Sequence, residues 1–458
     1  MNASVKTGLM CVLAGVLGLA ELNAEEAKPM LKDFVGINGH TILFDSSDYS
    51  SIAKLGRDYH GINWDLGDET NNALNFPWAD NGVNWDNVYG NWEAGGVSVH
   101  ASLMLHKFPE ASDWANVEAD AKAYGRAFAQ HFGPSAGNGL VKTVEIGNEP
   151  HEMSSALYRR VFRSMAEGIK EVDPQVKIAT CAVAVNPTSE YIKNISIYND
   201  MLDLVDIFSV HTYSRLEGWP TWEQSYPEDT QATYFEVVED VINWRNSFAE
   251  GKEVWVTEFG YDASTKNPSD SGQFKNWVDV TDRQQAQYLV RSYAAFAKLD
   301  VERAYMYWFD DKDRPELYGS SGITRNGVPK ESYWALEQMQ TLLGDYRFDE
   351  VIREDNVYVY SFVNGENEND EIWVVWSPTG DNVEFDFVLE GLEGEVEWVK
   401  EMAINSWDDW TGDFELLGDD MMSLRIGESP TYIKINNLPE PSTLMIVSGL
   451  VLVMCRRR

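Results

Sequence analysis

Two stretches decide the fold expected for this chain: VEIGNEP at residues 144–150 and VWVTEFG at residues 254–260. In each, a short and mostly apolar run is followed at once by polar residues, which is typical of a buried strand that ends at an open edge. Comparable runs recur along the chain, and amphipathic helical segments lie between them. This alternation predicts βα units arranged around a parallel sheet.

Eight such units predict an α/β fold in which the strands close into a (β/α)8 TIM barrel. The expected strands are residues 34–37, 59–64, 97–105, 141–146, 176–179, 205–210, 254–256 and 304–308. The expected helices include residues 114–132, 155–172, 231–248, 283–299 and 332–343. We therefore assign residues 25–345 to the barrel.

The pattern changes after Gly344 to short segments in which apolar and polar residues alternate. A period of two with polar turns between the segments is typical of antiparallel strands. Acidic residues also far outnumber basic ones between Asp345 and Lys434, which marks a separate unit. Residues 346–436 are thus expected to form a small C-terminal antiparallel β-sandwich domain.

Both ends of the chain have the composition of targeting segments. Residues 1–24 carry a basic residue, an apolar run and small residues in the order of a secretory signal peptide. Residues 437–458 contain Pro439-Glu440-Pro441, an apolar run and three final arginines, and they resemble the bacterial PEP-CTERM sorting signal. That resemblance implies exosortase-type sorting machinery as a partner and transient membrane anchoring through this segment. A secreted bacterial protein at the cell surface or in the extracellular matrix is expected.

Charge and cysteine content exclude several classes. The net charge of −38 argues against binding to nucleic acid, because phosphate contacts need basic patches, and it disfavours a polyanionic substrate. Cys11 and Cys455 lie in the two end segments, so Cys181 would be alone in the mature protein. No internal disulfide is expected there.

Two glutamates stand where the chemistry of this fold is expected. Glu149 follows the fourth expected strand and Glu258 follows the seventh. In a (β/α)8 barrel the carboxyl ends of all strands meet at one mouth, so the two side chains should face each other across it. Cleavage of a glycosidic bond needs such a pair, with one carboxylic acid that donates a proton and one carboxylate that attacks.

The motifs around these glutamates resemble those of glycoside hydrolase clan A. Asn148-Glu149-Pro150 is similar to the acid/base motif on strand four of that clan, and Thr257-Glu258-Phe259-Gly260 to the nucleophile motif on strand seven. The resemblance implies a retaining glycosidase, with a tyrosine that orients the nucleophile, a histidine that supports the acid/base and a tryptophan floor. These roles fall on Tyr213, His211 and Trp308. Asn148 is expected to bind the sugar 2-hydroxyl.

Histidines near the barrel mouth and aromatic residues in the loops are further candidates for substrate binding. Several histidines are expected near the mouth, and hydrogen bonding to sugar is favoured over a metal site because the His-x-His pair of metal-dependent barrel hydrolases is missing from the first strand. We expect no metal and no cofactor. Aromatic residues in the loops suggest stacking subsites for a polymer. The candidates are His60, Trp64 and His106 for the site, with His40 and His151 nearby and Trp78, Trp85, Trp92, Trp219 and Trp222 in the loops.

Arg57 is not assigned to the site, because it lies two residues before the expected start of the second strand. The expected function is hydrolysis of a polysaccharide or oligosaccharide. Two alternatives stay open: a transglycosidase that uses the same glutamates, and a surface carbohydrate-binding protein without catalysis.

Overall fold

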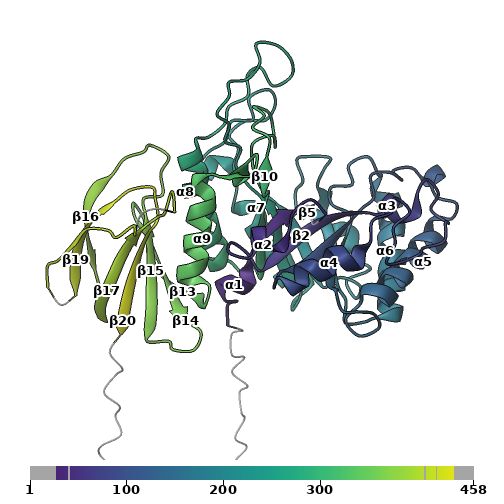
Figure 1. Ribbon diagram of the computed structural model, residues 1–458, viewed down its shortest axis with the longest axis horizontal. Helices are drawn as coiled ribbons and strands as arrows, with labels where there is room; N and C mark the ends of the chain where they lie inside the picture. The colour runs from purple at the N-terminus through teal and green to yellow at the C-terminus, as the bar shows by residue number, and fades with distance from the viewer. Residues whose placement is uncertain (1–26, 40–41, 393, 407–408, 419, 438–458) are drawn as a thin grey trace, which may run out of the picture.

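The structure, a computed structural model, describes residues 27–39, 42–392, 394–406, 409–418 and 420–437. Its first part is a closed barrel of parallel strands surrounded by helices, and its second part consists of antiparallel sheets (Figure 1). The predicted signal peptide and sorting segment lie outside the described residues, except for Asn437. None of the described helices combines the length and apolar character needed to cross a membrane.

Eight parallel strands form the barrel, and pairing of the fourth with the fifth closes it. This confirms the predicted (β/α)8 fold. The strands in chain order are β1 (Val35–Gly39), β2 (Leu55–Gly61), β3 (Ser98–Met104), β4 (Val141–Ile146), β5 (Lys177–Ala184), β7 (Ile207–His211), β8 (Glu253–Phe259) and β9 (Arg303–Met306). A short strand, β6 (Lys193–Asn194), extends β5 at the rim.

The longer helices cover the barrel from outside, and the short ones lie near the ends of its strands. They are α1 (Leu31–Phe34), α2 (Ser46–Tyr49), α3 (Ile62–Leu66), α4 (Trp85–Ala94), α5 (Val117–Phe132), α6 (Ser155–Val172), α7 (Glu236–Phe248), α8 (Asp282–Lys298) and α9 (Glu331–Leu343). Helices α5 and α6 approach closely at two glycines. A Cβ atom on Gly125 would lie 2.2 Å from the carbonyl oxygen of Met165, and one on Gly168 would lie 2.3 Å from that of Lys122. The contact therefore requires residues without side chains.

The second strand differs most from the sequence-based expectation. It begins at Leu55 instead of Tyr59 and ends at Gly61. Its first half contains Arg57 and Asp58, which are charged but buried, so hydrophobic pattern alone could not find it. The backbone pairs with β1 and β3 over this half, and this places Arg57 inside the barrel wall.

The C-terminal part is the expected antiparallel sandwich. One sheet has the order β13-β14-β15-β20-β17 and the other β16-β19-β18. A shared apolar core that includes Val375, Ile433, Leu389 and Met422 lies between them. The bounds are β13 (Tyr346–Glu354), β14 (Tyr358–Asn364), β15 (Asp370–Trp376), β16 (Phe385–Glu390), β17 (Gly394–Glu401), β18 (Phe414–Leu416), β19 (Met421–Ile426) and β20 (Thr431–Asn437). A small sheet of β10 (Asp310–Asp311), β11 (Thr324–Arg325) and β12 (Val328–Pro329) follows the last barrel strand.

The sandwich packs directly against the barrel. Tyr360 and Trp376 belong to the same continuous apolar core as the barrel helices. A buried polar contact reinforces this junction: Arg291 of α8 pairs with Glu228, which also accepts a hydrogen bond of 2.7 Å from the Trp376 indole nitrogen. Arg291 Nη1 donates to the carbonyl oxygen of Thr379 at 3.0 Å. The two parts are therefore joined by apolar and ionic contacts together.

Cys181 lies on β5 and is buried. Its sulfur lies 3.5 Å from the hydroxyl oxygen of Tyr198. Burial raises the pKa of the Cys181 thiol to about 12. The described part of the chain therefore carries a single, protonated thiol.

Candidate active site

The two glutamates meet at the carboxyl end of the barrel. Glu258 is the sixth residue of β8, and Glu149 lies three residues beyond the end of β4. One carboxylate oxygen of each and a ring nitrogen of His211 all lie within 4.8 Å of one another. Both glutamates line a cavity of about 420 Å³. Their placement after strands four and seven thus brings both side chains into one hollow.

Glu258 is held by three donors. Tyr59 donates to Oε1 at 2.7 Å, Tyr213 donates to Oε2 at 3.0 Å, and Arg57 Nη1 lies 3.0 Å from Oε1. Burial by itself would raise the pKa of Glu258, but the charges of His211 and Arg57 and the two tyrosine hydrogen bonds outweigh it and lower that pKa. Glu258 is therefore ionised and fixed in orientation at neutral pH.

His211 lies between the two carboxylates. Its Nδ1 atom is 2.8 Å from Glu149 Oε1 and 3.5 Å from Glu258 Oε2. Burial works to lower the pKa of His211, but the Glu258 carboxylate and the hydrogen bond with Glu149 raise it above its ordinary value. A proton on Nδ1 therefore faces both acids, and His211 stands where the resemblance placed it, beside Glu149.

Arg57, which was not expected from the sequence to belong to the site, organises its floor. Its guanidinium contacts Glu145 at 2.5 Å, Asn38 Oδ1 at 2.7 Å and Asn148 Oδ1 at 2.6 Å, in addition to Glu258. The side chains of Arg57 and Glu145 are fully buried. The charge of Arg57 offsets the burial of Glu145, whose pKa is lowered to about 2. A correct start of β2 at Leu55 would have been the signal for this role.

The cavity wall supplies aromatic and polar surfaces. Trp64, on α3, and His106, just beyond β3, line it as expected, together with Asn148. Partial burial lowers the pKa of the His106 imidazole. Tyr307 and Tyr318 line it as well, and the sequence analysis did not single them out. Trp308 is not among the described residues that line this cavity; its ring stacks on Tyr307 at 5.7 Å between centroids.

His60 requires a correction, because it does not face the cavity. Its Nδ1 atom is 2.7 Å from the Tyr89 hydroxyl and its Nε2 atom 2.7 Å from Asp65 Oδ2, so both ring nitrogens are engaged. The ring is completely buried and stacks on Trp85. Successive residues of a strand point to opposite sides, so Arg57 and Tyr59 face the barrel interior while His60 faces the helices.

The tryptophans expected to form aromatic subsites fall into a buried group and an exposed group. Trp85 and Trp92 are fully buried in the core and cannot contact a substrate. Trp78 and Trp219 keep 51% and 68% of their surface exposed, and Trp222 is half-buried against Arg215. His40 lies outside the described residues. Fewer tryptophans than expected from the sequence are therefore accessible for contacts with a polymer.

Glu149, His211 and Glu258 also form a group of potential metal ligands. His211 hydrogen-bonds to Glu149 and lies 3.5 Å from Glu258, and the Arg57 cation already lies against Glu258. A second cation beside Arg57 would be repelled. The arrangement is suited to proton transfer between carboxyl groups.

Comparisons with known proteins agree with this chemistry. Residues 96–296, which include both glutamates, match the family model of cellulase (glycosyl hydrolase family 5). A family 39 glycoside hydrolase from Bacteroides cellulosilyticus WH2 has a similar structure, with a TM-score of 0.65, 16% identity, and coverage of 89% of this chain and 81% of that chain. No curated protein sequence matches the chain.

Two further solved structures share the fold. A GH30 endoxylanase from Clostridium papyrosolvens C71 has a TM-score of 0.55 at 14% identity, covering 90% of this chain and 97% of that chain. CelM2, a bifunctional glucanase-xylanase from a metagenome library, has a TM-score of 0.58 at 13% identity, with the same coverage. These neighbours share the barrel fold. The family match over residues 96–296 and the paired glutamates within it support a barrel glycosidase.

Proposed function

We propose that the protein is a retaining glycoside hydrolase that cleaves a polysaccharide or oligosaccharide by double displacement. Glu258 is the nucleophile and Glu149 the acid/base. The observation that carries this proposal is the short separation of the two carboxyl groups, with oxygens within 4.8 Å. Retaining enzymes place these groups about 5–5.5 Å apart, whereas inverting enzymes need about 6.5–9.5 Å for a water molecule.

In the first step Glu258 attacks the anomeric carbon while Glu149 gives its proton to the departing glycosidic oxygen. The bond from the anomeric carbon to the leaving sugar breaks as the ester with Glu258 forms. Because Tyr59, Tyr213 and Arg57 hold the Glu258 carboxylate, no proton has to leave the nucleophile before attack.

In the second step Glu149, now a carboxylate, takes a proton from water, and the resulting oxygen nucleophile displaces Glu258 from the sugar. His211 lies 2.8 Å from Glu149, so it can stabilise that carboxylate. Two inversions at the anomeric carbon give net retention. The proton taken from water leaves Glu149 protonated again, which completes the cycle.

Asn148 is oriented to bind the sugar. Arginine can only donate hydrogen bonds, so the Asn148 atom that faces Arg57 at 2.6 Å must be the amide oxygen. The amide nitrogen is then free of this contact and can donate to the 2-hydroxyl beside the reacting carbon. Such a contact strengthens as positive charge develops in the transition state.

Azide rescue tests the two roles separately. With an activated aryl glycoside that the wild type hydrolyses, Glu258→Gly should be inactive, and azide should restore turnover to a product of inverted configuration. Glu149→Ala should accumulate the glycosyl-enzyme, and azide should give a product of retained configuration. Exchanged stereochemistry would reverse the assignment, and full activity of either variant would refute the pair. Transfer to added sugar instead of water would identify a transglycosidase.

We also propose that the enzyme is secreted and sorted to the bacterial surface. The support is the order of residues in segments 1–24 and 437–458, which resemble a signal peptide and a PEP-CTERM signal. Intact-mass analysis of the native surface protein should give a chain that starts near Glu25 and lacks the residues beyond Pro439-Glu440-Pro441. Retention of either segment would contradict this proposal.

A further inference from the structure

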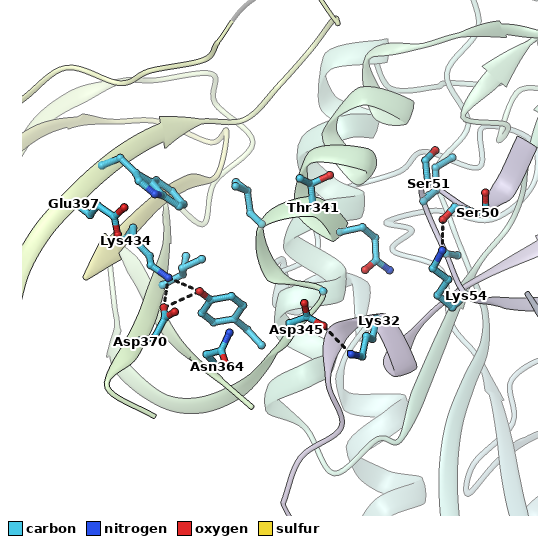
Figure 2. Close-up of a pocket in the computed structure, with 18 of the residues that line it drawn as sticks. Lys32, Ser50, Ser51, Lys54, Thr341, Asp345, Asn364, Asp370, Glu397 and Lys434 are labelled. Carbon is cyan, nitrogen blue, oxygen red and sulfur yellow. Dashed lines mark hydrogen bonds and ion pairs between the residues drawn. The ribbon is translucent and has the colours of Figure 1, made fainter. Parts of the chain in front are cut away.

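A second and larger hollow lies at the junction of the barrel and the sandwich (Figure 2). This seam cavity has a volume of about 740 Å³ and is lined by both parts of the chain. On the barrel side it reaches Lys32 of α1 and Lys54, the residue before β2. These residues stand at the amino ends of the barrel strands. The seam cavity therefore opens on the face opposite Glu149 and Glu258.

The sandwich side of the seam cavity carries an aromatic residue beside a polar cluster. Trp398, Lys434 and Ile372 are cross-strand neighbours on β17, β20 and β15, and all three line the hollow. Lys434 Nζ contacts the hydroxyl of Tyr346 and the carboxylate of Asp370, as Figure 2 shows. The partly buried Trp398 indole lies at the end of this row.

Lys434 is unusual for its position in the sheet. Two residues earlier on the same face of β20, Tyr432 is fully buried in the core that joins sandwich and barrel. Only 10% of the Lys434 side chain is exposed. Burying an ammonium group costs free energy that an apolar residue would not, even when it is paired. Packing alone would favour an apolar side chain here, so the polar cluster points to a ligand.

The barrel side offers further hydrogen-bonding groups. Ser50, Ser51 and Thr341 contribute hydroxyls to the wall, and Gln340 contributes an amide. The Gln340 amide nitrogen is buried and has no hydrogen-bond partner in the described part of the chain. The serine and threonine hydroxyls therefore continue the polar surface of the sandwich side across the cavity.

The charges of the seam cavity are balanced, which is notable in a chain of net charge −38. Three lysines and three carboxylates line it: Lys32, Lys54, Lys434, Asp345, Asp370 and Glu397. Lys32 pairs with Asp345 at 2.7 Å, and Lys434 pairs with Asp370. An anionic ligand would have to displace these carboxylates, whereas a neutral ligand rich in hydroxyls can use them as acceptors.

We propose that the seam cavity is a non-catalytic binding site for a segment of neutral polysaccharide. This rests on the proposed function, because the ligand is taken to be the polymer that the catalytic site cleaves. The indole face of Trp398 suits the apolar face of a sugar ring, and the amides, hydroxyls and carboxylates suit its hydroxyls. The volume lies within the range of small-ligand sites, about 300–1,000 Å³. Binding there holds the enzyme on the polymer and raises the local substrate concentration.

The test uses the full chain with Glu258→Gln, so that no polymer is consumed. Native gels containing neutral xylan, hydroxyethylcellulose, xyloglucan or agarose measure retardation by each polymer. We expect retardation by at least one polymer and about tenfold weaker binding after adding Trp398→Ala, as for loss of one partly buried aromatic contact. Trp410→Ala, in the same domain but outside the seam cavity, is the matched control and should leave retardation unchanged.

A second variant guards against misfolding of the first. Ser51 is exposed on the barrel wall, so Ser51→Tyr should fill the hollow without disturbing the core, and it should weaken retardation similarly. In an otherwise wild-type chain, Trp398→Ala should lower kcat/KM on the polymer but leave kcat/KM on an aryl glycoside unchanged. Unchanged retardation in both seam variants, or no retardation by any polymer, would overturn the proposal. Retardation without hydrolysis by the wild type would instead refute the hydrolase and leave this site standing.

Discussion

Among the described residues, Arg57 and Arg291 are completely buried, and their side chains have different roles. The side chains of Arg57 and Arg291 have no exposed surface. Arg291 faces one carboxylate, Glu228, and a backbone carbonyl at the junction of barrel and sandwich. Arg57 faces two carboxylates, Glu145 and Glu258, at the catalytic mouth. Arg291 contacts a single carboxylate, whereas Arg57 is shared between two.

The two carboxylates that share Arg57 differ in their access to the cavity. Glu145 has no exposed side-chain surface, while 8% of the Glu258 side chain is exposed and lines the cavity. The cation thus neutralises Glu145 in the interior and leaves Glu258 ionised where a sugar can reach it. The Arg291 pair joins two parts of the chain, whereas Arg57, together with His211, keeps a carboxylate ionised at the cavity.

Arg57→Met should have the largest effect, because it removes the cation from both carboxylates. We expect kcat/KM on an activated glycoside to fall by roughly 10²–10³, the usual cost of losing a preorganised electrostatic contact. The pKa of Glu258 should rise, so the acidic limb of the pH profile should move to higher pH. Activity within tenfold of the wild type would mean that Arg57 does not hold the nucleophile.

Arg291→Met should instead lower the free energy of unfolding and leave kcat/KM nearly unchanged. Breaking a buried pair costs about 3–5 kcal/mol, because Glu228 would remain without its cation. Urea unfolding should measure this loss, and kcat/KM below the transition should stay within about twofold. A large loss of activity in the folded variant would show that the two networks are coupled.

Acid should distinguish the two networks further. The folded-state pKa of Glu145, about 2, lies below its ordinary value of 4.5. A lowered carboxyl pKa contributes stability that is present above the ordinary value and is lost as pH falls from there through the folded value. The free energy of unfolding should therefore drop between about pH 4.5 and pH 2, and Glu145→Gln should flatten that slope. An equal slope in the variant would rule out Glu145 as its source.

The smallest effect is expected for Tyr213→Phe, which removes one of three donors to Glu258. Loss of one hydrogen bond to a charged group costs about 1.5–3 kcal/mol, so kcat should fall by roughly ten- to a hundredfold. Tyr234→Phe is the control, because its hydroxyl donates to Ser292 in the core and not to the catalytic pair. If the two variants had the same kcat, Tyr213 would not support the nucleophile.

The sequence predicted those parts of the molecule that follow from apolar periodicity. The barrel and the sandwich form as expected, and α6 spans the expected residues Ser155–Val172, because their buried faces are apolar. The glutamates were found because each follows such a strand. Arg57 was missed because the first half of its strand does not follow the apolar pattern. That half contains charged residues, which can be buried only because they are paired with other polar groups.

The error at His60 has a related cause. The expected strand at residues 59–64 did not show which of its side chains face the barrel interior. His60 was therefore chosen, although Tyr59 is the residue that contacts Glu258. The seam cavity could not be foreseen at all. It depends on how β17 and β20 lie against α9 and the segment before β2, and no local pattern specifies that packing.

Cys181 has a practical consequence for future experiments on this protein. Residues 27–437 contain no other cysteine, and burial keeps its pKa at about 12. The thiolate is the reactive form, so this side chain should resist maleimides and other thiol reagents while the fold is intact. For labelling chemistry that span behaves as if it were free of thiols. A cysteine introduced at an exposed position such as Trp219 would be its single reactive handle for a fluorophore.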